Sequence, residues 1–172
     1  MTFRVHTAAP IDAPRLREIE LLAGEQFRET PYAFVADHDP FTLDELAAYE
    51  RDGRSWVAVG ADDRPIGYIV VDLVDGNAHV EQVSVLPHHQ GQGVGRMLMA
   101  VVDGWARAAR CPAITLTTFV DVPWNAPLYR HLGFDVLAAS ELGPDLRALV
   151  AAEAAHGLDP RTRVCMRTLV LG

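Results

Sequence analysis

The feature that most constrains this chain is a short glycine-rich stretch, HHQGQGVGRML, at residues 88–98. It follows the valine-rich segment VEQVSVL at residues 80–86, and apolar residues recur at helical spacing after it. Glycine tolerates positive φ and lets another molecule approach the backbone closely. A strand, a glycine loop and a helix N-terminus in this order favour anion binding, because free N–H groups and the positive end of the helix dipole converge there.

The glycine spacing excludes two common phosphate-binding patterns. A Walker loop needs G-x-x-x-x-G-K-[ST], but Gln90 stands where its first glycine belongs and Arg96 follows Gly95. A dinucleotide fingerprint that begins at Gly91 needs glycine at position 96. The pattern that remains is Q-x-x-G-x-G, formed by Gln90, Gly93 and Gly95. A tight strand-to-helix turn without any ligand is the alternative.

Hydrophobic periodicity predicts alternating strands and helices. Thr42 and Glu45 predict a capping box at the start of the second helix. The strand, helix and strand between residues 77 and 120 predict two parallel, neighbouring strands. Strands are expected at 3–7, 55–60, 65–76, 77–86, 113–120, from 134 onward and at 161–172, and helices at 13–27, 42–53, from 94 over about four turns, 123–134 and 143–157. The apolar face of the helix after the glycine loop is expected to comprise Val94, Leu98, Val101 and Trp105.

Composition narrows the class of protein. The 172 residues carry a formal net charge of −8, which disfavours a broad surface for nucleic acid or anionic membranes. Cys111 and Cys165 lack the spacing of a zinc site or a disulfide framework. The N-terminal residues contain no apolar signal segment, and no apolar run approaches the ~18 residues of a membrane span. A cytoplasmic protein that binds neither nucleic acid nor membrane is therefore expected.

The Q-x-x-G-x-G loop resembles the acyl-coenzyme A pyrophosphate loop of the GNAT superfamily of N-acetyltransferases. The segment LYRHLGF at residues 128–134 resembles a second signature of that family. The order of predicted elements agrees over most of the chain, with a helix near 145–156 as an addition. The resemblance implies one α/β domain over residues 1–172, with a mixed, strongly twisted sheet, splayed central parallel strands and helices on both faces.

The resemblance also implies acetyl-coenzyme A as co-substrate and assigns its contacts. Arg96 would add its charge or simply be a solvated helix residue. Family members commonly carry asparagine seven residues before the signature tyrosine, where this chain has Val122. Asn125 is therefore either a cofactor contact or a helix cap. Pantetheine would pair with Val83, Ser84 and Val85, and the pyrophosphate would contact Gln90, Gly91, Gly93, Val94, Gly95 and Arg96.

The implied chemistry is attack by an amine on a thioester, which needs a base because an alkylamine with a pKa of about 10.4 is mostly protonated at neutral pH. Glu81 lies on the same strand face as Val83 and Val85, and is the first choice for the base, directly or through water. An ion-paired carboxylate at the strand end is the alternative. His79 shares this face as the alternate base, or as a structural residue.

The departing thiolate needs a proton or a hydrogen bond, which a phenol can supply. Tyr129 in LYRHLGF matches the position of the acid in the family. Leu128 and Leu132 are expected to form the buried stripe of its helix, which would leave Tyr129 at the flank of that stripe. The alternative is an aromatic side chain that belongs to the core.

These residues predict an N-acetyltransferase that moves an acetyl group directly from acetyl-coenzyme A to a primary amine of an unidentified acceptor, a small molecule or a peptide. A non-catalytic acyl-coenzyme A binding or sensing module is the alternative, and Glu81 together with Tyr129 favours the enzyme. The segment 27–41, with Asp37 and Asp39, either lines the acceptor pocket or is a surface loop. No metal is expected, because His88 and His89 lack a third ligand. Homodimers are frequent in the family.

Overall fold

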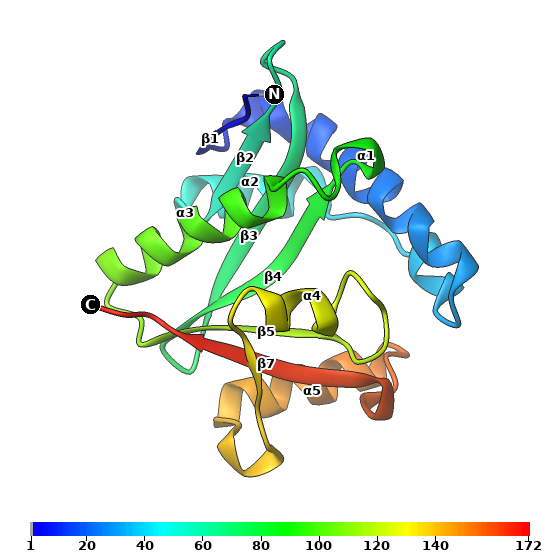
Figure 1. The fold of residues 1–172 in the computed structure, drawn as a ribbon, viewed down its shortest axis with the longest axis vertical. Coiled ribbons are helices and arrows are strands. Elements are labelled where there is room, and N and C mark those ends of the chain that lie inside the picture. The colour runs from blue at the N-terminus through cyan, green and yellow to red at the C-terminus, as the bar shows by residue number, and fades with distance from the viewer. Residues whose placement is uncertain (1) are drawn as a thin grey trace. The chain divides into compact units, whose positions relative to one another are not determined.

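The computed structural model describes residues 2–172 and divides them into two compact units, residues 2–71 with 82–102 and residues 72–81 with 103–172. Three elements run from one unit into the other: β3 (Pro65–Val74), β4 (Asn77–Val85) and α3 (Val94–Ala108). Across the described residues, seven strands follow the order β1-β2-β3-β4-β5-β7-β6 (Figure 1). The predicted α/β class with a mixed sheet is confirmed.

The first unit contains an antiparallel arrangement of β1 (Arg4–Thr7), β2 (Ser55–Val59) and the first part of β3. All five residues of β2 are buried, so both faces of this strand are covered. The helices α1 (Ala13–Gly24) and α2 (Leu43–Arg51) bury Leu16, Ile19 and Leu46.

The predicted capping box at α2 is confirmed. The Thr42 hydroxyl accepts a hydrogen bond from the Glu45 amide, and the Glu45 carboxylate accepts one from the Thr42 amide. Because both bonds satisfy amides that a helix start leaves without partners, these two residues place the beginning of the helix.

The second unit contains the start of β4 together with β5 (Ala113–Phe119), β7 (Arg163–Leu169) and β6 (Asp135–Val136). β4 and β5 are parallel neighbours, as the strand–helix–strand pattern predicts. Their pairing comprises only Ala78 with Ile114 and His79 with Thr115, although both strands continue further. Pairing between the two strands therefore ends before either strand does, as splayed central strands require.

Helices cover both faces of the sheet in the second unit, as Figure 1 shows for α4 (Ala126–His131) and α5 (Pro144–Ala155). The Thr118 hydroxyl donates a hydrogen bond of 2.7 Å to Asn125 Oδ1 at the start of α4. The preceding Thr117 hydroxyl donates one of 2.6 Å to Glu153 Oε1 on α5. Because successive strand residues point to opposite faces, the two helices lie on opposite sides of β5.

Contacts far apart in sequence hold α5 in place. The two Asp75 carboxylate oxygens accept hydrogen bonds of 2.9 and 3.0 Å from the amides of Asp145 and Leu146, at the first turn of α5. A Cβ at Gly143 would lie 2.4 Å from this carboxylate, so glycine is needed at that position. Below the cap, Leu146 packs in a buried cluster with Val74 and Cys165.

Replacing Asp75 with alanine is expected to lower the free energy of unfolding by about 0.5 to 2 kcal/mol, because two amides of α5 lose their acceptors. Urea denaturation of Asp75→Ala beside Asp135→Ala, an exposed aspartate on β6, measures the difference. Equal stability of the two variants would contradict the assigned cap.

The structure differs from the sequence-based expectation in three elements. The helix predicted at 13–27 ends at Gly24 and continues as a 3-10 helix, and the strand expected after Phe134 has two residues. The buried face of α3 comprises Val94, Leu98, Met99, Val102 and Ala106, whereas Val101 and Trp105 are half-buried. The apolar stripe of this helix is wider than the surface it packs against, so packing decides which of its apolar residues are buried.

The 3-10 helices are η1 (Pro10–Asp12), η2 (Glu25–Glu29), η3 (Ala33–Asp37), η4 (Pro87–His89), η5 (Ala139–Glu141) and η6 (Pro160–Thr162).

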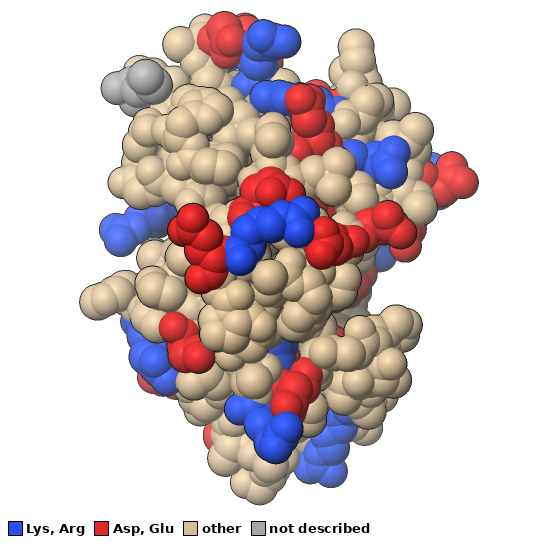
Figure 2. Space-filling view, turned by 90° about the vertical axis from the view of Figure 1, so that its right-hand side faces the viewer, with Lys and Arg blue, Asp and Glu red and all other residues tan. Residues whose placement is uncertain are grey.

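Acidic and basic side chains are interspersed on the face that Figure 2 shows, with acidic groups on several sides of the central basic group. No broad basic patch is visible on this face among the described residues. Within residues 2–172, no helix combines the length and the apolar character needed to cross a bilayer.

Candidate active site

The glycine loop connects β4 to α3 through η4 and two glycines in the left-handed region. Gly91 has φ of +72° and Gly93 has φ of +87°, conformations that strain other residues. Gln90 Nε2 donates a hydrogen bond of 3.0 Å to the Val85 carbonyl and so closes the loop onto the end of β4. These three predicted residues therefore shape the backbone of the loop.

The N-terminus of α3 presents free hydrogen-bond donors and open space. Met97 is bonded to the Gly93 carbonyl, whereas helix geometry leaves the amides of Val94, Gly95 and Arg96 without acceptors inside the helix. The φ of Gly95 is not positive. A Cβ at this position would meet open space, because no heavy atom lies within 4 Å of it apart from the chain neighbours and the backbone of the same helix. Arg96 is exposed and makes no ion pair with any described residue. This arrangement fits a pyrophosphate.

Close packing below the loop depends on Gly67 of β3. A Cβ at Gly67 would lie 2.9 Å from the Ser84 carbonyl oxygen and 3.4 Å from Val94 Cγ1. Ser84 is buried, while Val83 and Val85 on either side are half-buried. Sequence reasoning missed Gly67, although a glycine inside a strand pattern is a known signal of close backbone approach.

His79 is buried in the second unit, with a relative exposure of 1%. Its Nδ1 lies 2.9 Å from the Thr115 hydroxyl, and burial lowers its pKa to about 4 although Asp72 opposes the shift. Its Nε2 lies 3.9 Å from Glu81 Oε2, which is longer than a hydrogen bond. A neutral, buried imidazole of this kind is a weak proton acceptor at neutral pH.

Glu81 has a more suitable environment for a base. Partial burial raises its pKa to about 7, the charges of Asp72 and Glu153 add to this effect, and Arg163 opposes it. The side chain is 37% exposed, so solvent reaches it and screens part of these interactions. Among the described residues, Glu81 forms no ion pair with lysine or arginine. A carboxyl group that titrates near neutral pH can accept a proton there.

Tyr129 lies on α4, and its ring meets Phe134 edge-on with 5.7 Å between ring centroids. Burial raises its pKa to about 12, while Arg163 lowers it, so the phenol stays protonated at neutral pH. Its hydroxyl has no hydrogen-bond partner among residues 2–172. The expected buried stripe is wrong at Leu128, which is 43% exposed, because Ala126 anchors this six-residue helix instead.

Asn125 connects α4 to the end of β5. Its Oδ1 accepts hydrogen bonds from the Thr118 hydroxyl at 2.7 Å and from the Phe119 amide at 3.3 Å. The side chain makes no capping hydrogen bond to α4. The cofactor contact of Asn125 stays a prediction.

The segment between α1 and α2 folds into the 3-10 helices η2 and η3. Its Asp37 carboxylate pairs with Arg28 at 2.7 Å, and Arg28 also pairs with Glu25 at 3.1 Å. Asp37 is therefore already engaged, whereas Asp39 forms no ion pair with a described residue. Of the two predicted acidic groups, Asp39 is the one available to a cationic ligand.

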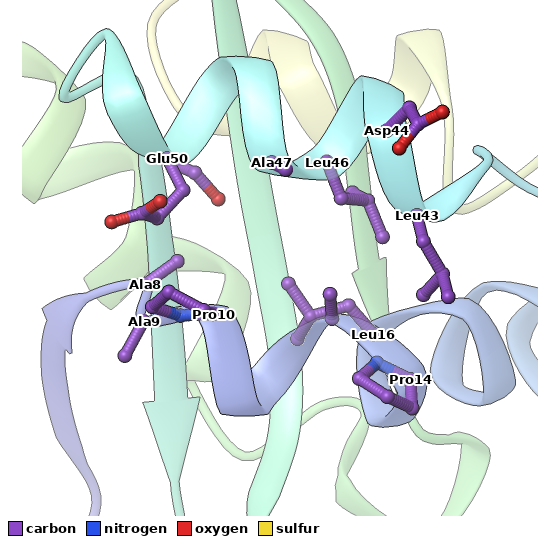
Figure 3. Close-up of a pocket in the computed structure, with 12 residues that line it drawn as sticks. Ala8, Ala9, Pro10, Pro14, Leu16, Leu43, Asp44, Leu46, Ala47 and Glu50 are labelled. Atoms are coloured by element: carbon purple, nitrogen blue, oxygen red, sulfur yellow. The ribbon is translucent and has the colours of Figure 1, made fainter.

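A pocket of about 250 Å³ lies in the first unit, between α2 and the chain that leads into α1 (Figure 3). Leu43 and Leu46 of α2 point toward Leu16 and Pro14 of α1 in this view. None of the predicted site residues is among those that line this pocket. It is therefore not the site that the glycine loop indicates.

A mixed α/β fold in which a glycine loop opens a helix at a strand end is an arrangement that favours a phosphate-bearing ligand. The chain belongs to the acetyltransferase (GNAT) family, whose sequence model matches residues 16–134. This finding confirms the resemblance carried by the Q-x-x-G-x-G loop and the LYRHLGF segment.

Two relatives and one solved structure describe this membership further. Streptothricin acetyltransferase of Streptomyces lavendulae is 34% identical, over 91% of this chain and 93% of that protein. Aminoglycoside N(6')-acetyltransferase type 1 of Stenotrophomonas maltophilia is 30% identical, over 72% of this chain and 87% of that protein. The PaiA N-acetyltransferase of Thermoplasma acidophilum, solved in complex with coenzyme A, shares the fold with a TM-score of 0.71 at 12% identity, over 98% and 99% of the two chains.

Proposed function

We propose that this chain transfers the acetyl group of acetyl-coenzyme A directly to a primary amine. The observation that carries this proposal is the open N-terminus of α3, where Gly95 faces free space beside unpaired amides in a member of an acetyltransferase family. A pyrophosphate there would accept hydrogen bonds from Gly91, Gly93, Val94, Gly95 and Arg96. Gln90 would hold the loop in shape through the Val85 carbonyl.

The co-substrate supplies an acetyl thioester, and the residues of this chain move the protons. Glu81 takes a proton from the ammonium group of the acceptor, which frees the nitrogen lone pair for attack on the carbonyl carbon. The carbon–nitrogen bond forms, and the carbon–sulfur bond breaks. Tyr129 then donates its hydroxyl proton to the departing sulfur. The nitrogen loses its second proton to solvent, solvent reprotonates Tyr129, and Glu81 releases its proton to solvent, so that one proton is set free in each turnover. The products are an N-acetylated acceptor and free coenzyme A.

A small molecule with one or more amino groups is the proposed acceptor. Two relatives support this class, since their names give streptothricin and aminoglycosides as their substrates. A panel of small amines, aminoglycosides and peptides, assayed for release of free coenzyme A, tests the proposal. Turnover with small amines is expected. Tight coenzyme A binding without turnover on any member of the panel would favour a non-catalytic binding module.

Replacing Gly95 with leucine is expected to raise the Kd for coenzyme A by roughly 10- to 100-fold, since the side chain would occupy the space above the free amides and displace charge-assisted hydrogen bonds. Calorimetric titration measures this change. Gly104→Leu is the matched control, because Gly104 lies on the same helix and a Cβ there also meets open space. Equal affinities in the two variants would count against the pyrophosphate site.

A further inference from the structure

A largely buried ion pair in the second unit links α5 to the sheet. Glu153 of α5 lies 3.2 Å from Arg163 of β7, and their side chains are 22% and 14% exposed. Thr117 of β5 bonds to both, donating to Glu153 at 2.6 Å and accepting from Arg163 at 3.0 Å. The Arg163 guanidinium also lies 4.7 Å from the centre of the Phe119 ring. Thr117 and Phe119 therefore hold the pair in one geometry.

Strand register places this pair on the same face of the sheet as Glu81. His79 is opposite Thr115 on β5, and Phe119 is opposite Arg163 on β7. Residues opposite each other share a face, and so do residues two apart on one strand. Glu81 is two residues after His79 and therefore shares its face. On β5, the side chains of Thr115, Thr117 and Phe119 lie on that same face. Glu81 and Arg163 therefore belong to the face that α5 covers.

The negative charge of Glu153 and the positive charge of Arg163 both act on the Glu81 carboxyl group. Glu153 favours a proton on Glu81 because it is negative, and Arg163 opposes a proton because it is positive. The titratable and charged groups on this face are Asp72 of β3, His79 of β4, Arg163 and Cys165 of β7 and Glu153 of α5.

We propose that Glu153 and Arg163 form a positioning pair that balances the charge around Glu81, so that α5 contributes to acetyl transfer as well as to the fold. This inference rests on the proposed role of Glu81 as the base. Because the two members of the pair act on Glu81 with opposite signs, intact pairing leaves Glu81 close to the point at which it exchanges a proton at neutral pH. Loss of either member of the pair changes how strongly Glu81 holds its proton, and the sign of the remaining charge sets the direction of this change.

The test is the titration of the Glu81 carboxyl, followed by carbon NMR of the side chain and by the pH dependence of kcat/KM. Glu153→Gln leaves the guanidinium uncompensated and is expected to lower the Glu81 pKa by roughly 0.5 to 1.5 units, the scale on which one neighbouring charge shifts the pKa of a partly exposed carboxyl group. Arg163→Met is expected to raise it by a similar amount. The double variant should titrate near the wild type.

The surface pair of Glu141 and Arg167 provides the matched control. Arg167 lies on β7 like Arg163, its distance to Glu141 is 3.2 Å, and both side chains are about 40% exposed. Arg167 is opposite Thr115 and so shares the face of Glu81, but solvent screens its exposed charge. Glu141→Gln and Arg167→Met are therefore expected to leave the Glu81 titration unchanged. A general loss of stability would lower activity in every destabilised variant without moving the Glu81 pKa in opposite directions.

The outcomes separate this inference from the proposed function. An unmoved Glu81 titration in Glu153→Gln and Arg163→Met, or shifts in one common direction, overturns the positioning pair. An active Glu81→Gln enzyme overturns the role of Glu81 as base instead, whatever the NMR titration shows. If Glu153→Gln does not fold, Arg163→Met decides alone, because it must raise the Glu81 pKa. Glu153→Asp, which keeps the charge, is expected to restore the wild-type titration.

Discussion

Replacing Tyr129 with phenylalanine is expected to lower kcat by about 10² to 10⁴ while coenzyme A binding changes little. The substitution removes one hydroxyl and keeps the ring, so the edge-on contact with Phe134 remains. The lost group is a phenol that stays protonated at neutral pH and has no hydrogen-bond partner among the described residues. Loss of a general acid costs a rate factor of this size.

Steady-state kinetics with the acceptor found in the amine panel, together with calorimetry for coenzyme A, measure the effect. Tyr49→Phe on α2 is the matched control, since it makes the same chemical change on another helix. Turnover at the wild-type rate in a folded Tyr129→Phe variant would mean that water or a backbone amide stabilises the leaving thiolate.

Replacing Glu81 with glutamine is expected to lower kcat/KM by about 10² to 10⁴ near pH 8, because the acceptor amine loses its base. The pH profile gives the sharper signature. Glu81 must be deprotonated to act, and its pKa is raised to about 7, so wild-type activity should rise as the pH increases through 7. Glu81→Gln should lack this limb, and the residual activity should follow the ionisation of the amine alone.

Rates measured from pH 5 to pH 9 with one acceptor test this expectation, with Glu29→Gln, an exposed glutamate of η2, as the control. If Glu81→Gln keeps the full rate and the rise in activity through pH 7, that rise belongs to the ionisation of another group. Water would then be the remaining candidate for the base, because burial holds the pKa of His79 at about 4.

Features encoded over a few residues could be predicted from the sequence. Thr42 and Glu45 predict the start of α2 because both partners of the capping box lie within one helical turn. The spacing of Gln90, Gly93 and Gly95 predicts the loop, because positive φ at Gly93 and a bare backbone at Gly95 are properties of the residues themselves. The alternation of a strand places Glu81 on the face of His79 without any knowledge of the fold.

Tertiary structure decided which groups surround these residues. Asp75 caps a helix that begins about 70 residues later, and Glu153 and Arg163 meet through Thr117, a contact that no local pattern announces. Local backbone preference depends on a residue and its immediate neighbours, so the sequence alone determined the loop, the cap and the strand face. Desolvation and the charges around Glu81 depend on segments brought together by packing, so only the fold decided where its proton is held.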